Sequence, residues 1–397
     1  MNSKIKRTDG EKKAPTGGEL IAYEDQGEKE ALAQLERRED FDAKRLSRLL
    51  SATDLTRKEN SPVKFIIDKV LQLDDFKNFD VVSAPETITP VNGFDLFNFP
   101  IDHPSRSSSD TYFINPERIL RTHTTSMWFY YLNDSKIREK LEKQKWLGEI
   151  SFGKVYRKDE IDSKHFPVFH QIDGLYICKR EDKQITLKTL QDVLENIVKS
   201  VFGPKIEFKF LSDQFPFTDP STQIEIKRGS DWIEIVGAGI VHKKVLKNFN
   251  IDPEIYHGWA FGFGIERLAM IKNNIPDIRI LWSEDARITS QFKNLNSKFK
   301  EVSKYPAIVR DISFVIKKDT SLNFIYEIVR HLGGDLVEEL KKLDEYSDEE
   351  KFGPDKKSYT FRIVFRSNER TLTNEEINKI YQEIERMVVK ELKAKIR

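Results

Sequence analysis

Apolar side chains recur along the chain at two different spacings, and each spacing predicts a different element. In residues 61–76 they follow Ser61-Pro62 at helical intervals, which predicts a capped helix with one buried face. Residues 207–211 and 223–227 instead alternate apolar and charged side chains, as antiparallel strands with one wet face do. Up to about residue 285 strands outnumber helices and no strand–helix–strand repeat occurs. This part therefore predicts an α+β domain on an antiparallel sheet.

The C-terminal part has a compact pattern of its own. A strand, a helix, two strands and a long helix with Asn374 near its cap are predicted, which is the order of a ferredoxin-like sandwich. The segments that carry this pattern are 307–316, 321–331, 335–346, 357–366 and 374–394.

Three polar segments lie outside these patterns. Residues 1–20 are rich in Lys, Gly, Pro and Thr and predict a disordered tail. Residues 27–50 predict a charged helix with few apolar positions. Residues 286–303 show little apolar periodicity and predict a linker.

Composition limits the classes of function. The chain has 397 residues, which predicts two or three domains, and a net charge of +1, so any nucleic-acid site must be a local patch. The single cysteine, Cys178, excludes an internal disulfide and a cysteine zinc site. No apolar run approaches the roughly 20 residues of a membrane span. The N-terminus lacks the apolar core of a secretory peptide and carries acidic residues that transit peptides avoid, so a cytoplasmic protein is expected, with an organelle as the alternative.

The strongest candidate for chemistry is the run from Gly258 to Met270, which contains Gly-x-Gly-x-Glu-Arg. Its glycines let a strand pass close to a ligand before a helix begins. Arg267 lies at the opening of that helix, where free N–H groups and the helix dipole favour anions. The run predicts a nucleotide platform with a phosphate-binding arginine; a glycine-rich packing turn is the alternative.

Further strings accompany this run: Leu120–Thr125, Val155–Asp159, Phe169–Gly174 and Phe215–Ser221, with Asp102–Arg106 as additional support. Together with the run they resemble, in order and spacing, the catalytic domain of the class II phenylalanyl-tRNA synthetases. The stretch from Tyr305 to Phe314 resembles that family's ferredoxin-like anticodon-binding domain, and the order of the two parts is similar to the single-chain, organelle-type enzymes. The resemblance implies a class II catalytic domain over 56–285 and an anticodon-binding domain over 304–397. The tail and charged helix then occupy 1–55, and the linker occupies 286–303.

The resemblance implies that the chain uses ATP and Mg²⁺ to activate an amino acid. Arg157 and Arg267 are the expected catalytic residues, because a fixed guanidinium fork can neutralise the charge that develops on the α-phosphate. The ring of Phe169 would stack on adenine, opposite Arg267. Glu234 is the candidate magnesium ligand, with an exposed strand residue as the alternative. The expected ATP-binding residues are Arg157, Asp159, Phe169, His170 and Arg267.

Phenylalanine is the amino acid that the resemblance implies. The family usually has Ser in place of Thr125 and Glu in place of Asp173, which keeps the functional group and changes its reach. The residues expected to meet the substrate ammonium group are His123, Thr125, Gln171 and Asp173.

The same resemblance implies an aromatic pocket for the substrate ring. Phe215 and Phe217 would meet that ring edge-to-face. Ala260 with residues 237–239 would form the pocket floor.

The implied function is a phenylalanine–tRNA ligase that forms the adenylate and passes phenylalanine to the 3′ end of tRNA(Phe). The expected state is a monomer without an obligate partner subunit or a membrane. A non-catalytic tRNA-binding paralogue is the rival function, and a subunit that needs a partner chain is a second rival. Arg157, Gln171 and Arg267 argue against the paralogue, and the attached C-terminal domain argues against the subunit. Candidate tRNA contacts, with a solvated charged face as the alternative, are Lys304, Arg310, Arg362, Arg366 and Arg370.

Overall fold

The computed structural model describes residues 5–301 and 305–397, which fold as two compact units. The two units are not continuous in sequence, because two earlier segments of the chain pack with the C-terminal segment in the second unit. The first unit holds the described residues up to Tyr156, together with Val168–Asn274 and Phe292–Lys298; the second holds Arg157–Pro167, Ile275–Gln291 and the described residues of Phe299–Arg397.

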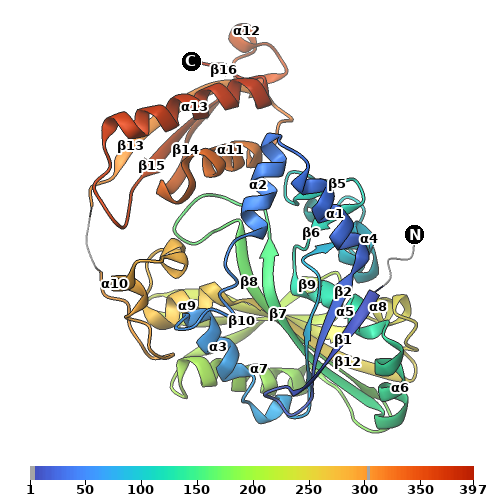
Figure 1. The fold of residues 1–397 in the computed structure, drawn as a ribbon. Helices are drawn as coiled ribbons and strands as arrows, with labels where there is room; N and C mark the ends of the chain where they lie inside the picture. The colour runs from blue at the N-terminus through green and yellow to red at the C-terminus, as the bar shows by residue number, and fades with distance from the viewer. Residues whose placement is uncertain (1–4, 302–304) are drawn as a thin grey trace. The chain divides into compact units, whose positions relative to one another are not determined.

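A nine-stranded sheet in the order β1-β2-β3-β7-β8-β12-β11-β10-β9 is the frame of the first unit (Figure 1). Most neighbours are antiparallel, which confirms the predicted sheet, but β3 pairs in parallel with both β2 and β7. The strands are β1 (Ile5–Lys13), β2 (Glu19–Asp25), β3 (Asp80–Ser83), β7 (Trp146–Tyr156), β8 (Val168–Lys179), β9 (Phe208–Phe215), β10 (Thr218–Arg228), β11 (Asp231–Val241) and β12 (Tyr256–Gly264).

Helices cover both faces of this sheet. On one face, α7 (Leu187–Phe202) packs on β11 and α9 (Ile265–Asn273) on β8, and α3 (Pro62–Val70) contacts both helices. On the other face, α5 (Trp128–Leu132), α6 (Ser135–Gln144) and α8 (Lys243–Asn248) contribute to an apolar core. Shorter elements are α4 (Pro90–Gly93), η1 (Asp74–Phe76), η2 (Asp95–Phe97), η3 (Pro104–Arg106), η4 (Thr124–Met127), and the small sheet of β4 (Thr87–Ile88), β5 (Phe113–Asn115) and β6 (Arg118–Leu120).

The N-terminal segment corrects two predictions. Residues 5–20 are not a disordered tail: β1 and β2 form an antiparallel pair, and alternate side chains of β2, Ile21 and Tyr23, are buried. Residues 1–4 of the predicted tail lie outside the described residues. Residues 27–50 are not one helix but two, α1 (Gln26–Glu36) and α2 (Phe41–Leu50). The break arises because Asp40 accepts a hydrogen bond from the amide of Ala43 and starts a new helix.

The second unit confirms the ferredoxin-like sandwich. Its four-stranded sheet has the order β14-β15-β13-β16, and α11 and α13 pack on one another. The N-cap of α13 is Thr373, whose hydroxyl accepts from the amide of Glu376, one residue before the predicted Asn374. The elements are β13 (Ile308–Lys317), α11 (Asn323–Gly333), η6 (Gly334–Leu336), β14 (Val337–Tyr346), α12 (Glu349–Phe352), β15 (Lys356–Phe365), α13 (Asn374–Leu392) and β16 (Lys395–Ile396).

In the described part of the predicted linker over 286–303, residues 290–301 form no helix or strand, and residues 302–303 lie outside the described residues. The segment begins with α10 (Ala286–Thr289), which follows η5 (Ile278–Trp282) in the second unit. Residues 292–298 belong to the first unit, where Asn273 donates to the carbonyls of Leu295 and Ser297. Among the helices of residues 5–301 and 305–397, none has the length and hydropathy needed to cross a bilayer.

Candidate active site

A row of paired residues across three strands builds the floor of the site. Asp173 on β8 pairs with Gly262 on β12, and Gly262 pairs with Gly237 on β11. A Cβ at Gly262 would lie 3.1 Å from Oδ2 of Asp173, and one at Gly237 would lie 2.7 Å from Cζ of Phe215. The two glycines therefore leave a bare strip of backbone with a carboxylate at one end and an aromatic ring at the other.

The carboxylate end is fixed by two hydrogen bonds. The hydroxyl of Thr125 donates to Oδ2 of Asp173 at 2.7 Å, and the indole N–H of Trp128 donates to Oδ1 at 2.8 Å. Burial raises the pKa of Asp173 to about 7, and the bonds from Thr125 and Trp128 oppose that rise. The structure thus brings the predicted residues Thr125 and Asp173 into contact, and it shows Trp128 as a second hydrogen-bond donor to Asp173.

His123 and Gln171 are each held in place within the first unit. The amide of Thr124 donates to Oε1 of Gln171 at 3.3 Å. The His123 ring is stacked on Phe99, and its Nε2 lies 2.9 Å from the carbonyl of Gly93, to which it donates. Gln171 lies on the same face of β8 as Asp173, because a single residue separates the two along the strand.

The aromatic end is formed by the predicted pair Phe215 and Phe217. Their rings are stacked with centroids 5.9 Å apart, and Phe217 is also 6.0 Å from Phe99. Ala260, which pairs with Gly239 on β11, is 3% exposed and belongs to the apolar core beneath this face. The two stacked rings and the buried Ala260 thus lie on the face of the sheet that carries the apolar core.

The predicted nucleotide platform involves the start of β8 and the start of α9. Phe169 is half-buried near the beginning of β8, and Arg267 is an exposed residue in the first turn of α9. The guanidinium of Arg267 donates to the backbone carbonyl of Glu234 at 3.0 Å. The Glu234 side chain is exposed on β11, opposite Glu225 in the ladder.

A magnesium ion would find only a partial set of protein ligands here. Within the described residues no group of three His, Cys, Asp or Glu side chains is arranged to hold a metal. Mg²⁺ usually takes one or two carboxylates together with waters and substrate phosphates. The exposed carboxylate of Glu234 fits such a partial role and does not provide a complete site.

His170, predicted to bind ATP, is instead buried on the other face of the sheet. Its side chain is 0% exposed, and Nδ1 lies 2.6 Å from Oε1 of Glu266. Its Nε2 lies 3.0 Å from the amide nitrogen of Leu55 and 3.3 Å from Oδ1 of Asp54. Burial lowers the pKa of His170, but the carboxylates of Glu266 and Asp54 outweigh burial and raise it to about 9. Because side chains alternate along a strand, His170 faces away from Phe169 and has no surface for the predicted contact with ATP.

The loop that carries Arg157 and Asp159 folds with the second unit. Arg330 donates to the carbonyls of Asp159 and Glu160 at 2.9 and 2.7 Å. The amide of Leu340 donates to the carbonyl of Ile161 at 2.7 Å. The loop is therefore held through its backbone by α11 and β14 of the ferredoxin-like sandwich.

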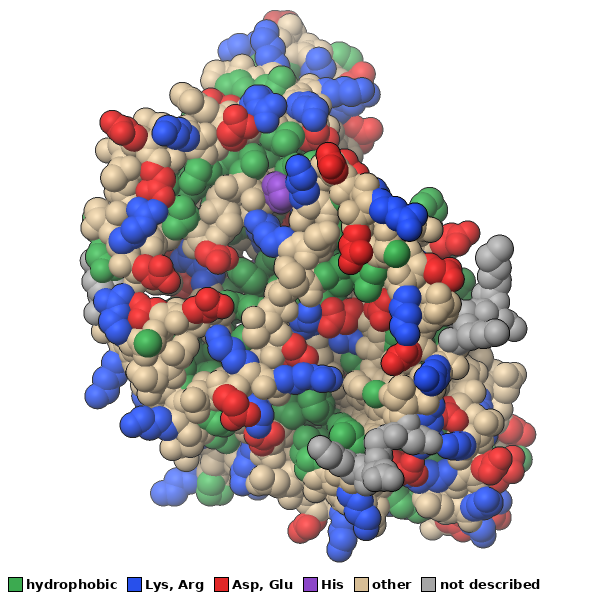
Figure 2. All heavy atoms as spheres, in the orientation of Figure 1, with side chains coloured by type: hydrophobic (Ala, Val, Ile, Leu, Met, Phe, Trp, Pro, Cys, Tyr) green, Lys and Arg blue, Asp and Glu red, His purple; other side chains and the backbone are tan. Residues whose placement is uncertain are grey.

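Charges of both signs are mixed on one face of the protein. On the face that Figure 2 shows, Lys and Arg side chains are interspersed with Asp and Glu side chains. This mixture agrees with a net charge of +1 for the whole chain. A tRNA site must therefore be sought in the environment of individual cations.

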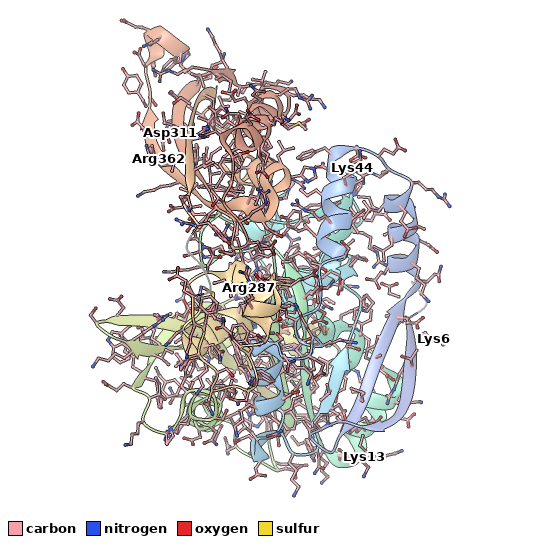
Figure 3. All side chains as sticks on the ribbon, turned by 60° about the vertical axis from the view of Figure 1, so that its left-hand side comes forward. Lys6, Lys13, Lys44, Arg287, Asp311 and Arg362 are labelled. Atoms are coloured by element: carbon pink, nitrogen blue, oxygen red, sulfur yellow. The ribbon has the colours of Figure 1, made fainter. Side chains whose placement is uncertain are left out.

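Two of the candidate tRNA contacts on β15 and after it are already paired. Arg362 forms two 2.8 Å bonds with Asp311, and the two residues lie opposite each other on β15 and β13 (Figure 3). Arg366 donates to Glu338 at 2.7 Å. Each pair lowers the positive charge offered to a phosphate.

The other candidate contacts differ in their partners. Arg370 is paired with Glu376, whereas Arg310 donates to the neutral side chains of Asn374 and Asn378. Lys304 lies outside the described residues. Of the arginines predicted to contact tRNA, Arg310 is therefore the one whose positive charge is not offset by a carboxylate partner in the bonds described above.

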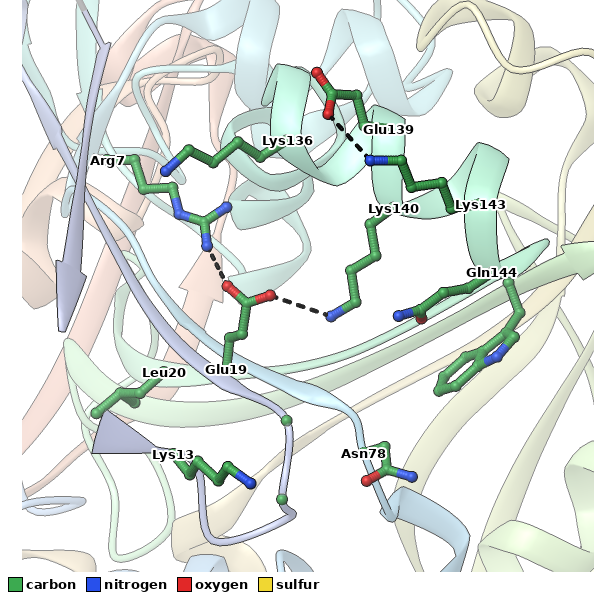
Figure 4. A pocket seen from close by; sticks show the side chains of 13 residues that line it. Arg7, Lys13, Glu19, Leu20, Asn78, Lys136, Glu139, Lys140, Lys143 and Gln144 are labelled. Atoms are coloured by element: carbon green, nitrogen blue, oxygen red, sulfur yellow. Dashed lines mark hydrogen bonds and ion pairs between the residues drawn. The ribbon is translucent and has the colours of Figure 1, made fainter. Parts of the chain in front are cut away.

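A separate pocket of about 720 Å³ lies in the first unit, between the β1–β2 pair and α6 (Figure 4). It is rich in cations, but Arg7 is paired with Glu19, and Lys140 with Asp80 and Glu19. None of the predicted site residues that the structure describes lines this pocket. It is therefore distinct from the site built on β8, β11 and β12.

The sequence analysis did not identify the residues that form hydrogen bonds to the predicted site residues or to their chain neighbours. Trp128 follows Thr125 by about one helical turn, so its spacing offered a signal. Glu266 lies in the glycine motif, but only its neighbour Arg267 was predicted to be a site residue. Arg330 is 171 residues from Asp159 in the chain, and no local pattern could have connected them.

Comparisons with known proteins agree with the motifs. Residues 48–292 match the family model of the tRNA synthetases class II core domain (F), and residues 303–397 match the ferredoxin-fold anticodon binding domain. The chloroplastic/mitochondrial phenylalanine–tRNA ligase of Arabidopsis thaliana is 37% identical, over 86% of this chain and 80% of that protein. The mitochondrial enzyme of Saccharomyces cerevisiae is 33% identical, over 88% of this chain and 90% of that protein.

A bacterial relative matches a shorter part. The phenylalanine–tRNA ligase alpha subunit of Caldicellulosiruptor bescii is 40% identical, over 54% of this chain and 63% of that protein. The longer matches are to proteins named as mitochondrial or chloroplastic, so the expectation of a cytoplasmic protein finds no support. The chain belongs to the class II tRNA synthetases and, within them, to the phenylalanine–tRNA ligase family.

Proposed function

We propose that the protein activates phenylalanine with ATP and transfers it to the 3′ end of tRNA(Phe). The observation that carries this proposal is the row Asp173–Gly262–Gly237 with Phe215 above its far end. A carboxylate suits an ammonium group, a bare glycine strip admits a flat ligand, and an aromatic wall suits a phenyl ring. An amino acid with an aromatic side chain is the ligand that meets all three requirements.

Activation joins the substrate carboxylate to the α-phosphate of ATP and releases pyrophosphate. Arg157, by its place in the motif, would stabilise the charge that develops on the phosphorus, and Arg267 would bind the nucleotide with Phe169 on the other side of adenine. Bound Mg²⁺ would neutralise phosphate charge, with Glu234 as its protein ligand. Placement and charge stabilisation carry this chemistry without a covalent nucleophile.

Charging of tRNA by the wild-type protein tests the proposal directly. Purified protein with ATP, Mg²⁺, labelled phenylalanine and tRNA(Phe) should form phenylalanyl-tRNA. No release of pyrophosphate in response to phenylalanine would instead favour the non-catalytic paralogue. We further propose that the protein works in an organelle, as its relatives' names suggest, and as a monomer without a partner subunit.

Phenylalanine binding should depend on pH through Asp173. Burial raises the pKa of this carboxyl to about 7, so its proton must leave before it can face the substrate ammonium group. The KM for phenylalanine should therefore fall as pH rises from about 6 to about 8, and the variant Asp173→Asn should lose this dependence. Pyrophosphate exchange across that range measures it; a KM independent of pH in the wild type would contradict the role of Asp173.

The same raised pKa affects stability in the opposite direction. A carboxyl whose folded pKa exceeds its unfolded value binds its proton more tightly in the folded state. The contribution of Asp173 is therefore fully present below its unfolded pKa and is lost as pH rises through about 7. Function at neutral pH thus needs the ionised form that folding disfavours.

Enlarging the floor should admit larger rings. Ala260→Gly removes a methyl group from the site face of β12, so para-chlorophenylalanine should become a substrate while phenylalanine is still used. Ala238→Gly is the matched control, because Ala238 is equally buried, at 3% exposed, but lies on the opposite face of the sheet, on β11. Equal discrimination by the two variants in pyrophosphate exchange would show that Ala260 is not the floor.

A further inference from the structure

Two pairs of adjacent residues in the first unit are joined through the core. Phe169 and His170 are adjacent on β8, and Glu266 and Arg267 are adjacent on α9. The amide of His170 donates to both carboxylate oxygens of Glu266 at 2.9 Å, and Nδ1 donates to Oε1 at 2.6 Å. Each member of the buried pair is therefore the chain neighbour of one of the two residues proposed to hold adenine.

Burial makes these hydrogen bonds important for the energy of the fold. His170 is 0% exposed and Glu266 is 2% exposed, and a buried carboxylate is unfavourable unless it is paired and hydrogen-bonded. Glu266 lies in the first turn of α9, where the helix dipole also favours a negative charge. Its bonds to the backbone and to the ring of His170 hold the start of the helix against the start of the strand.

The link to Glu266 does not depend on the charge of His170. Nδ1–H donates to Glu266 in both states, whereas Nε2 accepts from the amide of Leu55 when the ring is neutral and donates to Asp54 when it is charged. The Glu266 bond is thus the constant part of the network. The contacts with Asp54 and Leu55 attach the network to the segment before α3.

We propose that His170 and Glu266 are a positioning pair that fixes Phe169 and Arg267 relative to each other for ATP binding. The proposal rests on the proposed function for the identity of the nucleotide. It assigns neither member of the pair a contact with ATP. Loss of the pair should weaken ATP binding and leave phenylalanine binding, which depends on Asp173, nearly unchanged.

Two substitutions at His170 distinguish the bond that Nδ1 makes with Glu266 from the contacts that Nε2 makes with Leu55 and Asp54. In His170→Asn the side-chain amide lies near the position of Nδ1 and can still donate to Glu266; in His170→Gln it lies near Nε2 and reaches Leu55 and Asp54 instead. The Asn variant should keep ATP affinity within about 3-fold, and the Gln variant should lose about 10-fold or more, as expected for a lost charge-assisted bond. Equal affinities in the two variants would overturn the proposal.

The measurement is calorimetric titration of the full-length protein with ATP alone, together with the KM values for ATP and phenylalanine in pyrophosphate exchange. A rise of both KM values in proportion would indicate a merely structural role and overturn the proposal. Asp25→Asn is the matched control: Asp25 is 1% exposed and paired with Arg118 at 2.8 Å in the same unit, so its loss should lower stability without changing ATP affinity.

If His170→Gln does not fold, Glu266→Asp decides the question by the same titration. The shorter side chain keeps the charge and withdraws it from the ring, so ATP affinity should again fall about 10-fold. Unchanged affinity would overturn the proposal. Failure of the proposed function would show differently, because wild-type protein would then lack phenylalanine-dependent exchange whatever the variants bind.

Discussion

Replacing Arg157 by alanine is expected to reduce phenylalanine-dependent pyrophosphate exchange at least about 100-fold, as for loss of one transition-state donor. Arg157 is the first residue after β7 and is exposed, and we propose it as the motif arginine that meets the α-phosphate. Its guanidinium would meet charge that grows on the α-phosphate during the reaction, so kcat should fall more than the affinity for either substrate.

The control for this variant is Lys164→Ala in the same loop. Lys164 is also an exposed cation, and it is not among the residues proposed to bind a substrate. Exchange by Lys164→Ala should stay within about 2-fold of the wild type, since surface substitutions usually have small effects. Near-normal activation by a folded Arg157→Ala protein would show that the motif has been assigned to the wrong arginine.

Deletion of residues 303–397 is expected to abolish tRNA charging and also to slow pyrophosphate exchange. Charging should fall because the deleted domain would supply contacts with tRNA phosphates and bases. Exchange should fall about 10-fold or more because the loop with Arg157 loses Arg330 and Leu340, and small misplacements of a catalytic group are costly. The motifs alone favour the simpler expectation that exchange survives the deletion.

A double variant in the full-length protein tests the effect of the loop bonds on pyrophosphate exchange separately from the loss of tRNA contacts. Arg330→Met with Glu327→Gln removes the bonds to the loop without leaving Glu327, which is 1% exposed, as an unpaired buried charge. Exchange should fall while affinity for tRNA is retained. If a folded deletion protein exchanges at the full rate, the loop does not need the C-terminal domain; if it charges tRNA at the full rate, the domain does not read tRNA.

Strand alternation predicts which of the motif residues on β8 share one face of the sheet. Phe169, Gln171 and Asp173 have the same parity along β8 and lie on the site face, whereas His170 has the other parity and faces α9. The same alternation along β12 places Ala260 and Phe261 on opposite faces of the sheet. The prediction that His170 binds ATP treated adjacent motif residues as one site, whereas the structure buries its side chain on the opposite face, against Glu266.

Other features required the folded chain. The β1–β2 pair was missed because its sequence is mostly polar, and its stability depends on pairing with β3, which is distant in the chain. The loop 157–167 lies within the matched class II core, between two of its strands, and its packing with the second unit is a further feature that the sequence does not show. Both features concern long-range packing, which local periodicity does not encode.

The most direct test of the central claim is pyrophosphate exchange with each of the twenty amino acids in turn. We expect exchange with phenylalanine, and with tyrosine at about one hundredth of that efficiency, because an apolar pocket rejects an added hydroxyl only about 100-fold. Exchange that favours another amino acid over phenylalanine, or no amino-acid-dependent exchange at all, would contradict the account.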